Sequence, residues 1–223
     1  MKKPTLLSWS SGKDSAWSLQ VLNQQNDIEI VGLFSTVNQE FNRVAMHAVR
    51  VELLQLQAVS VCLPIQLIPI PYPCSNSQYE SIMNKFIEKT KANGIEYFAF
   101  GDLYLEDVRK YREDSLKGTG INPIFPLWGM NTKSLSEEMI DSGLKARITC
   151  VDPKQLSTDF AGIEYNKSFL ECIPDNIDPC GENGEFHTFV YDGPMFKEEI
   201  KISAGETITR DGFVFTDLMP ETE

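Results

Sequence analysis

The sequence predicts an α/β fold, a doubly wound parallel sheet followed by a smaller C-terminal α+β domain. In the first half of the chain, short apolar runs with strand character alternate with amphipathic segments of helical period. A loop of small residues follows the first apolar run, and a polar turn follows the fourth. After residue 128 the alternation stops, and turn residues separate short strands. We therefore expect two domains, residues 1–128 and residues 129–223.

The N-terminal elements follow the order of successive βαβ units. Strands are expected around Leu6 and Leu7 and over 28–36, 65–70 and 97–100, and helices over 15–22, 45–59 and 77–92. Asp14 or Ser15 is expected to cap the first helix, and Ser77 the third. Such sheets bind ligands beyond the carboxyl ends of their strands. The loop at 10–15 and the turn at 101–102 should therefore face one crevice.

The C-terminal part has the pattern of a small mixed domain. We expect a helix over 134–142, strands over 146–151, 187–191, 196–203, 206–209 and 213–216, and turns at 192–194 and 211–212. The exposed strand edges of such hairpins favour a homodimer.

Composition narrows the range of partners and compartments. The 223 residues carry 20 Lys and Arg against 32 Asp and Glu, a net charge of −12 that repels a nucleic-acid backbone. No segment is long and apolar enough to span a membrane. The five cysteines include no C-x-x-C pair and suit a reducing cytoplasm better than a disulfide framework or a structural zinc site. We therefore expect a cytoplasmic protein with neither membrane nor nucleic acid as a partner.

The first polar motif joins the first strand to the first helix. It consists of six residues, Ser10, Ser11, Gly12, Lys13, Asp14 and Ser15. Small residues let an anion approach the backbone, a helix N-terminus supplies partial positive charge, and the lysine adds a full one. The motif predicts a phosphate site, although an ordinary strand-to-helix turn would show the same local pattern.

This loop differs from the P-loop of kinases and GTPases. That motif needs a glycine five positions before its Gly-Lys pair and Ser or Thr directly after the lysine. Here those positions hold Leu7 and Asp14. The hydroxyl that would bind magnesium beside a γ-phosphate is absent from that position, so cleavage at the γ-phosphate is disfavoured.

A second cluster follows the fourth expected strand. Asp102 comes directly after Gly101, where a carboxylate can hold magnesium or a substrate ammonium group. On the charged helix that follows, Arg109 and Arg112 can reach phosphate oxygens across the same crevice. The alternative for this helix is a solvated surface stabilised by ion pairs.

A third cluster spans residues 178–190, where glycines alternate with carboxylates just before an apolar run. The stretch is too polar and too rich in glycine for a core strand. Glu182 or Glu185 can orient an amine or ammonia, and His187 can act as a base near neutral pH. The segment therefore predicts a functional loop, with a turn of exposed acids as the alternative.

Taken together, the three clusters resemble the diphthine–ammonia ligase family, a branch of the PP-loop ATP pyrophosphatases with an adenine nucleotide alpha-hydrolase-like fold. The similarity covers nearly the whole chain and rests on residues 10–15, 101–113, 126–128, 178–190 and 192–196. Ser11 departs from the signature Ser-Gly-Gly-Lys-Asp-Ser, which has glycine there. Residues 105–113 look like the form found in bacterial relatives.

The resemblance implies a two-step reaction. A substrate carboxylate attacks the α-phosphate of ATP, giving an acyl-adenylate and pyrophosphate, and ammonia then displaces AMP. It implies that residues 10–15 hold the ATP phosphates and that the Gly101–Asp102 region and residues 181–188 shape the substrate side. To these we add Gly101, Arg109 and Arg112 as expected ATP-binding residues and Asp102 as the expected Mg²⁺ ligand. Our candidate catalytic residues are Lys13, Asp102, Glu182, Glu185 and His187.

The acceptor implied by the resemblance is protein-bound diphthine. If the protein is bacterial, the acceptor must be a different carboxylate, because bacteria do not make diphthamide. Two other functions stay open. A PP-loop enzyme that adenylates a tRNA base would suit a more basic chain with paired catalytic cysteines, and a non-catalytic ATP-binding module would bind ATP without forming AMP.

Overall fold

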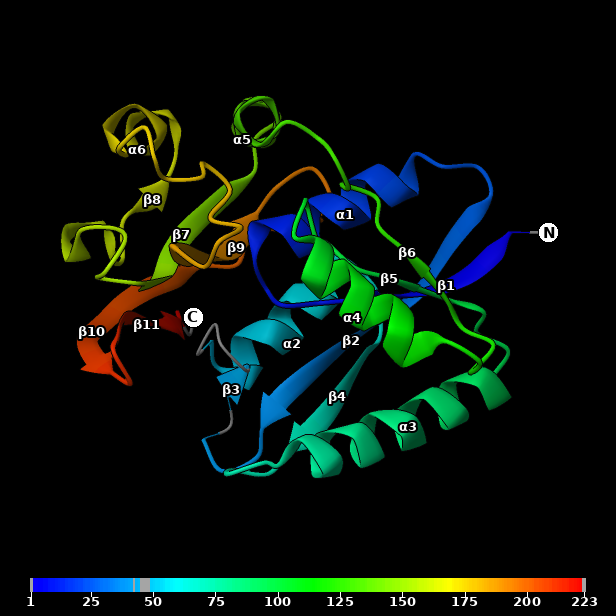
Figure 1. The fold of residues 1–223 in the computed structure, drawn as a ribbon. Coiled ribbons are helices and arrows are strands. Elements are labelled where there is room, and N and C mark those ends of the chain that lie inside the picture. The colour runs from blue at the N-terminus through cyan, green and yellow to red at the C-terminus, as the bar shows by residue number, and fades with distance from the viewer. Residues whose placement is uncertain (1, 42, 45–48, 222–223) are drawn as a thin grey trace.

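A computed structural model describes residues 2–41, 43–44 and 49–221 of the chain. It contains two sheets, one mostly parallel and one antiparallel. Figure 1 shows the parallel sheet with its helices in the half that holds the N-terminus, and the antiparallel sheet in the other half. The predicted fold class is confirmed.

The first sheet has the strand order of a doubly wound fold. Its strands are β1 (Lys3–Ser8), β2 (Ile28–Asn38), β4 (Ile65–Ile70), β5 (Tyr97–Ala99) and β6 (Asn122–Ile124), with β3 (Arg43–Val44) antiparallel on β2. The parallel pairs give the order β4-β2-β1-β5-β6. The chain thus winds outward from β1 to β4 and resumes on the other side of β1 at β5. In such sheets a crevice forms at this switch point, beyond the carboxyl ends of β1 and β5.

Helices cover both faces of this sheet. Leu7 and Leu33 pack with α1 (Lys13–Asn23) and α2 (Val51–Ser60), whereas the neighbouring residues Leu6 and Phe34 pack with α3 (Asn76–Ala92) and α4 (Glu106–Leu116). Adjacent residues on a strand point to opposite faces, so the apolar runs of the sequence serve two separate cores. The helices also fix which loops meet at the crevice.

The second sheet is antiparallel and extends the first core. Its strands are β7 (Lys145–Val151), β8 (Glu164–Tyr165), β9 (Phe186–Asp192), β10 (Ile202–Arg210) and β11 (Phe213–Pro220), accompanied by α5 (Thr132–Asp141), η1 (Thr158–Phe160) and α6 (Lys167–Cys172). Asp211 and Gly212 both have positive φ, 52° and 85°, as the predicted tight hairpin turn requires. The homodimer predicted from strand edges stays a prediction.

Three predicted helix starts are wrong. The first helix is capped by Gly12 rather than by Asp14 or Ser15, both of which lie in its first turn. The second starts at Val51, because Arg50 is extended; residues 45–48 of the predicted helix lie outside the described ranges. The third is capped by Ser75 and not Ser77, because Gln78 lies three residues after Ser75 and completes a capping box.

The strand predicted over 196–203 is also wrong for most of its length. Regular pairing starts only at Ile202. Before it, the backbone N–H of Lys197 donates to Ser60 O at 2.9 Å and that of Ile200 to Tyr191 O at 2.8 Å. The segment therefore uses its hydrogen bonds to join the end of α2 to β9 instead of extending a hairpin.

Within the described ranges, the helices are too short or too polar to cross a membrane. The division of the chain at residue 128 and a cytoplasmic location stay predictions.

Candidate active site

Two adjoining pockets open at the carboxyl ends of β1 and β5. The small pocket has a volume of about 220 Å³, and the large pocket has a volume of about 710 Å³. Ser8, Ser10, Phe100 and Arg112 line both. Predicted site residues that line the small pocket are Ser10, Lys13, Asp14, Ser15, Gly101, Asp102, Arg112, Glu182 and His187. The three sequence clusters therefore meet at one place, as expected for the switch point of the sheet.

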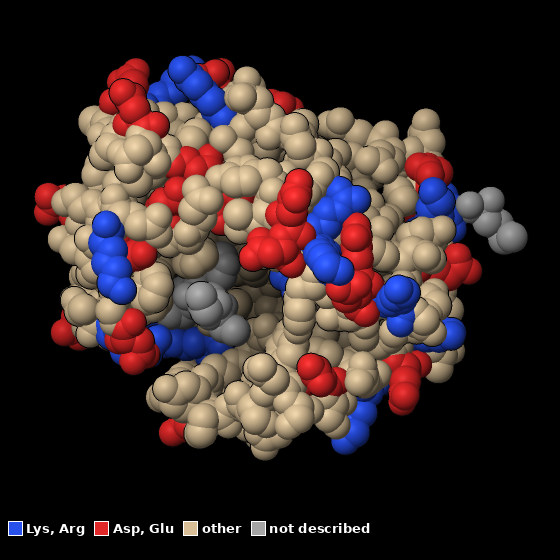
Figure 2. All heavy atoms as spheres, viewed as in Figure 1, with Lys and Arg blue, Asp and Glu red and all other residues tan. Residues whose placement is uncertain are grey.

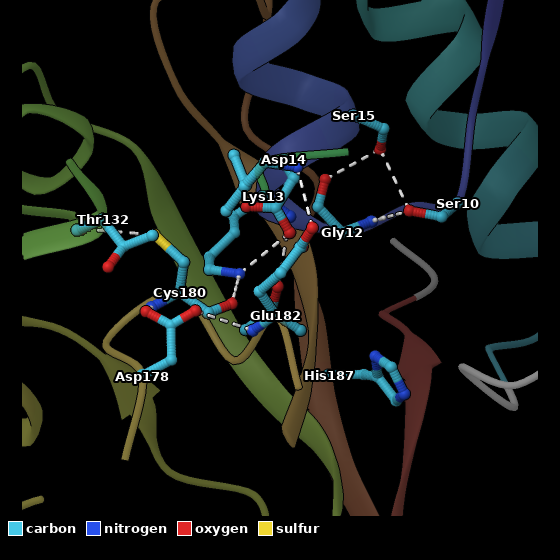
Figure 3. Close-up of polar contacts among 12 residues, drawn as sticks. Ser10, Gly12, Lys13, Asp14, Ser15, Thr132, Asp178, Cys180, Glu182 and His187 are labelled. Atoms are coloured by element: carbon cyan, nitrogen blue, oxygen red, sulfur yellow. Dashed lines mark hydrogen bonds and ion pairs between the residues drawn. The ribbon is translucent and has the colours of Figure 1, made fainter. Parts of the chain in front are cut away.

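The loop at 10–15 turns tightly between β1 and α1. Ser11 adopts a left-handed conformation with φ of 74°, and Gly12 is the N-cap of α1. The hydroxyl of Ser15 donates to Gly12 O at 2.8 Å and accepts from the hydroxyl of Ser10 at 3.3 Å. These bonds hold the Ser10 and Ser15 hydroxyls at the wall of the small pocket (Figure 3).

Gly101 allows the second cluster to approach this loop. A Cβ atom at this position would lie 3.0 Å from the carbonyl carbon and oxygen of Asp14. Any larger residue would push the Gly101–Asp102 turn away from the N-terminus of α1. The glycine thus brings Asp102 to the wall of the same pocket as Lys13.

The side chain of Lys13 is held by the neighbouring Asp14 and by the carbonyl of Cys180 in the third cluster. Its side chain is only 2% exposed, and its Nζ donates to Asp14 Oδ2 at 2.9 Å and in a short hydrogen bond to the carbonyl of Cys180. The rings of Tyr165 and Phe186 face Nζ, with centroids 5.7 and 5.4 Å away. Burial, the largest effect, acts to lower the pKa of Lys13, but Asp14, Cys180 and Asp178 together outweigh it and raise the pKa above its usual value. Lys13 is therefore a buried cation.

The loop is also bonded to β9 of the second sheet. The backbone N–H of Lys13 donates to Thr188 Oγ1 at 3.1 Å, and the N–H of Val190 donates to Ser11 O at 3.0 Å. Gln57 on α2 is fully buried and joins the same elements, donating to the carbonyls of Ser11 at 3.0 Å and Val190 at 2.6 Å. The side chain of Trp9 donates to Gln57 Oε1 at 2.8 Å. The two sheets are thus joined at the site.

Gln57 was not among the residues predicted from the sequence to belong to the site. It occupies a core position of α2 at helical spacing from Leu53 and Leu54, both of which are fully buried. A lone amide at a core position is the signal that would have identified it, since a buried amide needs partners.

Asp102 and Arg112 form an ion pair at the wall of the small pocket. Arg112 Nε lies 3.6 Å from Asp102 Oδ2, beyond hydrogen-bonding distance, and neither atom has a hydrogen-bond partner among the described residues. The guanidinium also lies over the ring of Phe100, at 4.9 Å from its centroid. Burial raises the pKa of Asp102. This ion pair therefore keeps one unused hydrogen-bond donor and one unused acceptor at the pocket.

Arg109 does not line either pocket. Its guanidinium packs over the rings of Phe125 and Trp128, with centroids 4.9 and 4.6 Å away, and Nε donates to Glu113 at 2.8 Å. Arg109 and Arg112 are three residues apart on α4, so their side chains point in directions that differ by about 60° around the helix axis. The structure brings only Arg112 to the crevice.

Glu182 connects the third cluster to the second. Its Oε1 accepts from the backbone N–H of Leu103 at 2.8 Å and of Tyr104 at 3.4 Å. Burial raises its pKa to about 7. A carboxyl group that titrates near neutrality at the wall of the pocket can exchange a proton with a bound ligand.

Asp178, which the sequence analysis did not single out, organises this loop. Its carboxylate accepts from the N–H groups of Cys180 at 3.2 Å and Glu182 at 3.0 Å, and from the Tyr104 hydroxyl at 3.2 Å.

Glu185 holds the backbone of Asp178 in place. Its Oε1 accepts from the N–H of Asp178 at 3.1 Å, and the side chain is 1% exposed and lines neither pocket. The structure therefore gives Glu185 a position that supports the loop.

His187 lines the small pocket but lies apart from the cluster around Lys13 (Figure 3). Burial and the positive charge of Lys13 lower its pKa to about 4. The imidazole is therefore neutral at pH 7, and a base with a pKa near neutrality, as the sequence suggested, is Glu182 instead.

Comparison with known proteins agrees with these clusters. The family model described as "Diphthamide synthase N-terminal domain" matches residues 1–123, and "Diphthamide synthase C-terminal domain" matches residues 131–217. The chain belongs to the diphthamide synthase family. The N-terminal match contains the loop at 10–15 and the C-terminal match contains the loop at 178–185, so the two matches include residues from both sides of the small pocket.

Curated relatives with the name diphthine–ammonia ligase extend this result. The protein of Bos taurus is 26% identical over 231 residues, covering 92% of this chain and 85% of the relative. The proteins of Homo sapiens and Danio rerio are 30% and 34% identical over 57% and 50% of this chain, and the matched parts cover 49% and 46% of those relatives. The chain thus spans about half the length of these two relatives. The predicted family, its ligase class and its use of ATP are confirmed.

Proposed function

We propose that this chain forms an amide from a carboxylate on a partner molecule, ATP and ammonia. Its family is one of ATP-dependent ligases. The curated relatives are named for diphthine and ammonia, so protein-bound diphthine is the first acceptor to test. The observation that carries the proposal is the meeting of a helix N-terminus, a buried lysine and a carboxyl group with a raised pKa around one small pocket.

The sizes of the two pockets support a division of ATP between them. The large pocket has aromatic walls, including Phe34, Phe98 and Tyr79, and its volume of about 710 Å³ suits a nucleoside. The small pocket adjoins it and has the hydroxyls and charges that phosphates require. Arg112 lines both pockets. The bond between nucleoside and phosphate would then lie at their junction, next to this arginine.

In the first step, an oxygen of the acceptor carboxylate attacks the α-phosphorus, and the bond to the β-phosphate breaks. The products are an acyl-adenylate and pyrophosphate. Negative charge grows on the bridging and β-phosphate oxygens during this step. The N-terminus of α1, the hydroxyls of Ser10 and Ser15 and the guanidinium of Arg112 supply fixed positive charge and donors at the pocket wall.

The side chains of the pocket fit Mg²⁺ in the form usual for nucleotide sites. Among the described residues no group of three or more His, Cys, Asp or Glu forms a protein-only metal site. Mg²⁺ needs only one or two carboxylates when phosphates supply further oxygens. Asp102 Oδ2 is buried, lacks a hydrogen-bond partner among the described residues and belongs to a residue of the small pocket. This carboxylate would hold the ion, which would neutralise phosphate charge.

In the second step, ammonia displaces AMP. An ammonium ion gives one proton to the ionised Glu182, and the lone pair of the resulting NH₃ forms a bond to the acyl carbon. The bond from this carbon to the AMP oxygen breaks, and the nitrogen releases a second proton to solvent. A carboxyl group with a pKa of about 7 is suited to accept the first proton near neutral pH.

The experiment uses ATP labelled at the α-phosphate, Mg²⁺, ammonium and a diphthine-bearing elongation factor. The proposal requires one AMP for each amide formed, and hydroxylamine in place of ammonium should give a hydroxamate. Reactions without acceptor and without ammonium are the controls. ADP as the nucleotide product would contradict the proposal, whereas AMP formed only with another carboxylate would retain the chemistry and change the acceptor.

The two alternative functions are not favoured. On the face shown in Figure 2, the basic side chains of the described residues are interspersed with acidic ones around the central hollow. A nucleic-acid backbone requires a continuous basic surface. A binding module without turnover would not require a carboxyl group with a raised pKa at its phosphate site.

A further inference from the structure

The surroundings of Lys13 Nζ form a binding site for a primary ammonium group. We define the Lys13 cradle as Asp14, Tyr165, Cys180 and Phe186. It supplies a carboxylate oxygen at 2.9 Å, a backbone carbonyl in a short hydrogen bond, and two aromatic faces with centroids 5.7 and 5.4 Å away. Carboxylates and carbonyls accept N–H donors, and ring faces attract compact cations. Nothing in this arrangement requires the rest of the lysine side chain.

Two further acids lie near the Lys13 cradle, besides the Asp14 carboxylate that Lys13 neutralises. Asp14 Oδ1 is buried and has no hydrogen-bond partner among the described residues. Asp178 also acts electrostatically on Lys13, and Glu182 lies beside the same cluster (Figure 3). An empty cradle would leave the Asp14 carboxylate, which is only 28% exposed, without its cationic partner, which is unfavourable. A cation should therefore occupy it in every state of the protein.

The proposed function places a second demand on the same lysine. Lys13 lines the small pocket and lies in the first turn of α1, where ATP phosphates would bind. A lysine side chain has four rotatable carbon–carbon bonds, and a polyphosphate is a stronger anion than one carboxylate shared with a carbonyl. When ATP binds, the ammonium group of Lys13 can turn from the cradle to the phosphates. The cradle then needs another cation.

We propose that the Lys13 cradle is the binding site of the substrate ammonium ion, which takes the place of the Lys13 ammonium group once ATP has bound. This inference rests on the proposed function, because it requires ATP and ammonium as substrates. It predicts a binding order in which ATP precedes ammonium. It also places the ion beside Glu182, the group proposed to accept its proton.

The first test replaces Lys13 so that the cradle is vacated. In Lys13→Ala, ammonium chloride should raise the melting temperature above that in sodium chloride at equal ionic strength. At ten times its dissociation constant a ligand shifts the folded-to-unfolded ratio about elevenfold, equivalent to a rise of about 3–6 °C for a chain of this size. Methylammonium should act similarly, since it reproduces the end of a lysine side chain.

Matched controls separate this effect from a general salt effect. Lys13→Met fills the cradle with an uncharged chain of similar length, so ammonium should give it no specific rise. Wild-type protein without nucleotide should give none either, because its own lysine occupies the cradle. Tetramethylammonium has the charge but no N–H donors, and it should fail with Lys13→Ala.

A second measurement decides the case in which Lys13→Ala does not fold. Crystals of the wild-type protein with a non-hydrolysable ATP analogue are soaked in thallium(I), an ion of about the size of ammonium. Anomalous density next to the Cys180 carbonyl should be present with the analogue and absent without it. The proposal is overturned if folded Lys13→Ala gains no ammonium-specific stability, or if Lys13 stays in the cradle with the analogue bound. Failure to form AMP would contradict the proposed function but leave both of these measurements interpretable.

Discussion

The backbone N–H of Lys13 donates a 3.1 Å hydrogen bond to the hydroxyl of Thr188, and this bond joins the first turn of α1 to β9 of the second sheet. Both residues are buried, with Lys13 and Thr188 each 2% exposed. A parallel strand N-terminal to α1 positions one partner, and an antiparallel strand far along the chain positions the other. The geometry of the loop at 10–15 therefore depends on the second sheet.

Thr188→Val should destabilise the protein, because valine keeps the shape of threonine and removes the acceptor of the Lys13 N–H group. Leaving a buried donor unpaired costs about 1–3 kcal/mol. Urea unfolding monitored by tryptophan fluorescence measures the change. Thr188→Ser, which keeps the hydroxyl, should lose less. An equal loss in both variants would mean that packing of the methyl group, rather than the hydrogen bond, matters at this position.

Local patterns were sufficient to predict the frame of the site. Leu6 and Leu7, or Leu33 and Phe34, alternate between two cores, and that alternation is visible in apolar runs. Because parallel strands place their carboxyl ends at one edge, the loop at 10–15 and the turn at Gly101 could be assigned to one crevice before any contact was known.

Side-chain directions within that frame depend on contacts between distant segments. Arg109 and Arg112 have similar local sequence surroundings, so the sequence does not distinguish them. In the structure Arg109 packs over the ring of Trp128, whereas Arg112 lines the small pocket. The tight contact of Lys13 with the Cys180 carbonyl spans 167 positions of the chain. The predicted cap of α3 was wrong for a local reason. Serine is a favourable N-cap at both positions 75 and 77, but only Ser75 has a glutamine, Gln78, three residues later to complete a capping box.

Ser11→Gly should stabilise the protein. Ser11 has φ of 74°, a conformation that is strained for residues with a Cβ atom, and its buried hydroxyl has no partner among the described residues. Glycine removes both the strain and the unpaired hydroxyl, but it also increases the conformational entropy of the unfolded chain. We expect a net gain of about 1 kcal/mol in the free energy of unfolding. The melting temperature should rise by about 2–4 °C. Ser11→Ala keeps the strain and should gain less; a glycine variant less stable than the wild type would contradict this explanation.

Glu182→Gln should change how stability depends on pH. The pKa of Glu182 is about 7 in the folded protein against 4.5 as its ordinary value. As pH rises from 4.5 to about 7, the unfolded chain loses this proton while the folded protein keeps it, so the wild type loses stability. Glutamine keeps the acceptor for Leu103 without titrating. The variant should therefore gain stability relative to the wild type across this window, as measured by urea unfolding at several pH values.

His187 provides a control of opposite sign for that experiment. Its pKa falls from 6.5 to about 4 on folding, so the unfolded chain binds a proton that the folded protein excludes. The wild type should lose stability through this group as pH falls from 6.5 towards 4. His187→Gln should flatten the acid side of the profile and leave the Glu182 effect in place. Parallel shifts of both variants would show that neither group causes the pH dependence.

Arg112→Met should weaken ATP binding, and Arg109→Met should not. Arg112 lines both pockets and has an Nε atom without a hydrogen-bond partner among the described residues, whereas Arg109 is bonded to Glu113 and covers Phe125 and Trp128. A hydrogen bond to a charged group contributes about 1.5–3 kcal/mol, equal to a loss of about 10- to 150-fold in affinity. Methionine keeps most of the apolar stem, so packing over Phe100 is largely preserved. Isothermal titration calorimetry with a non-hydrolysable ATP analogue measures binding without any acceptor. Equal losses in the two variants would place the nucleotide along the outer face of α4 and overturn the assignment of Arg112 to the phosphates.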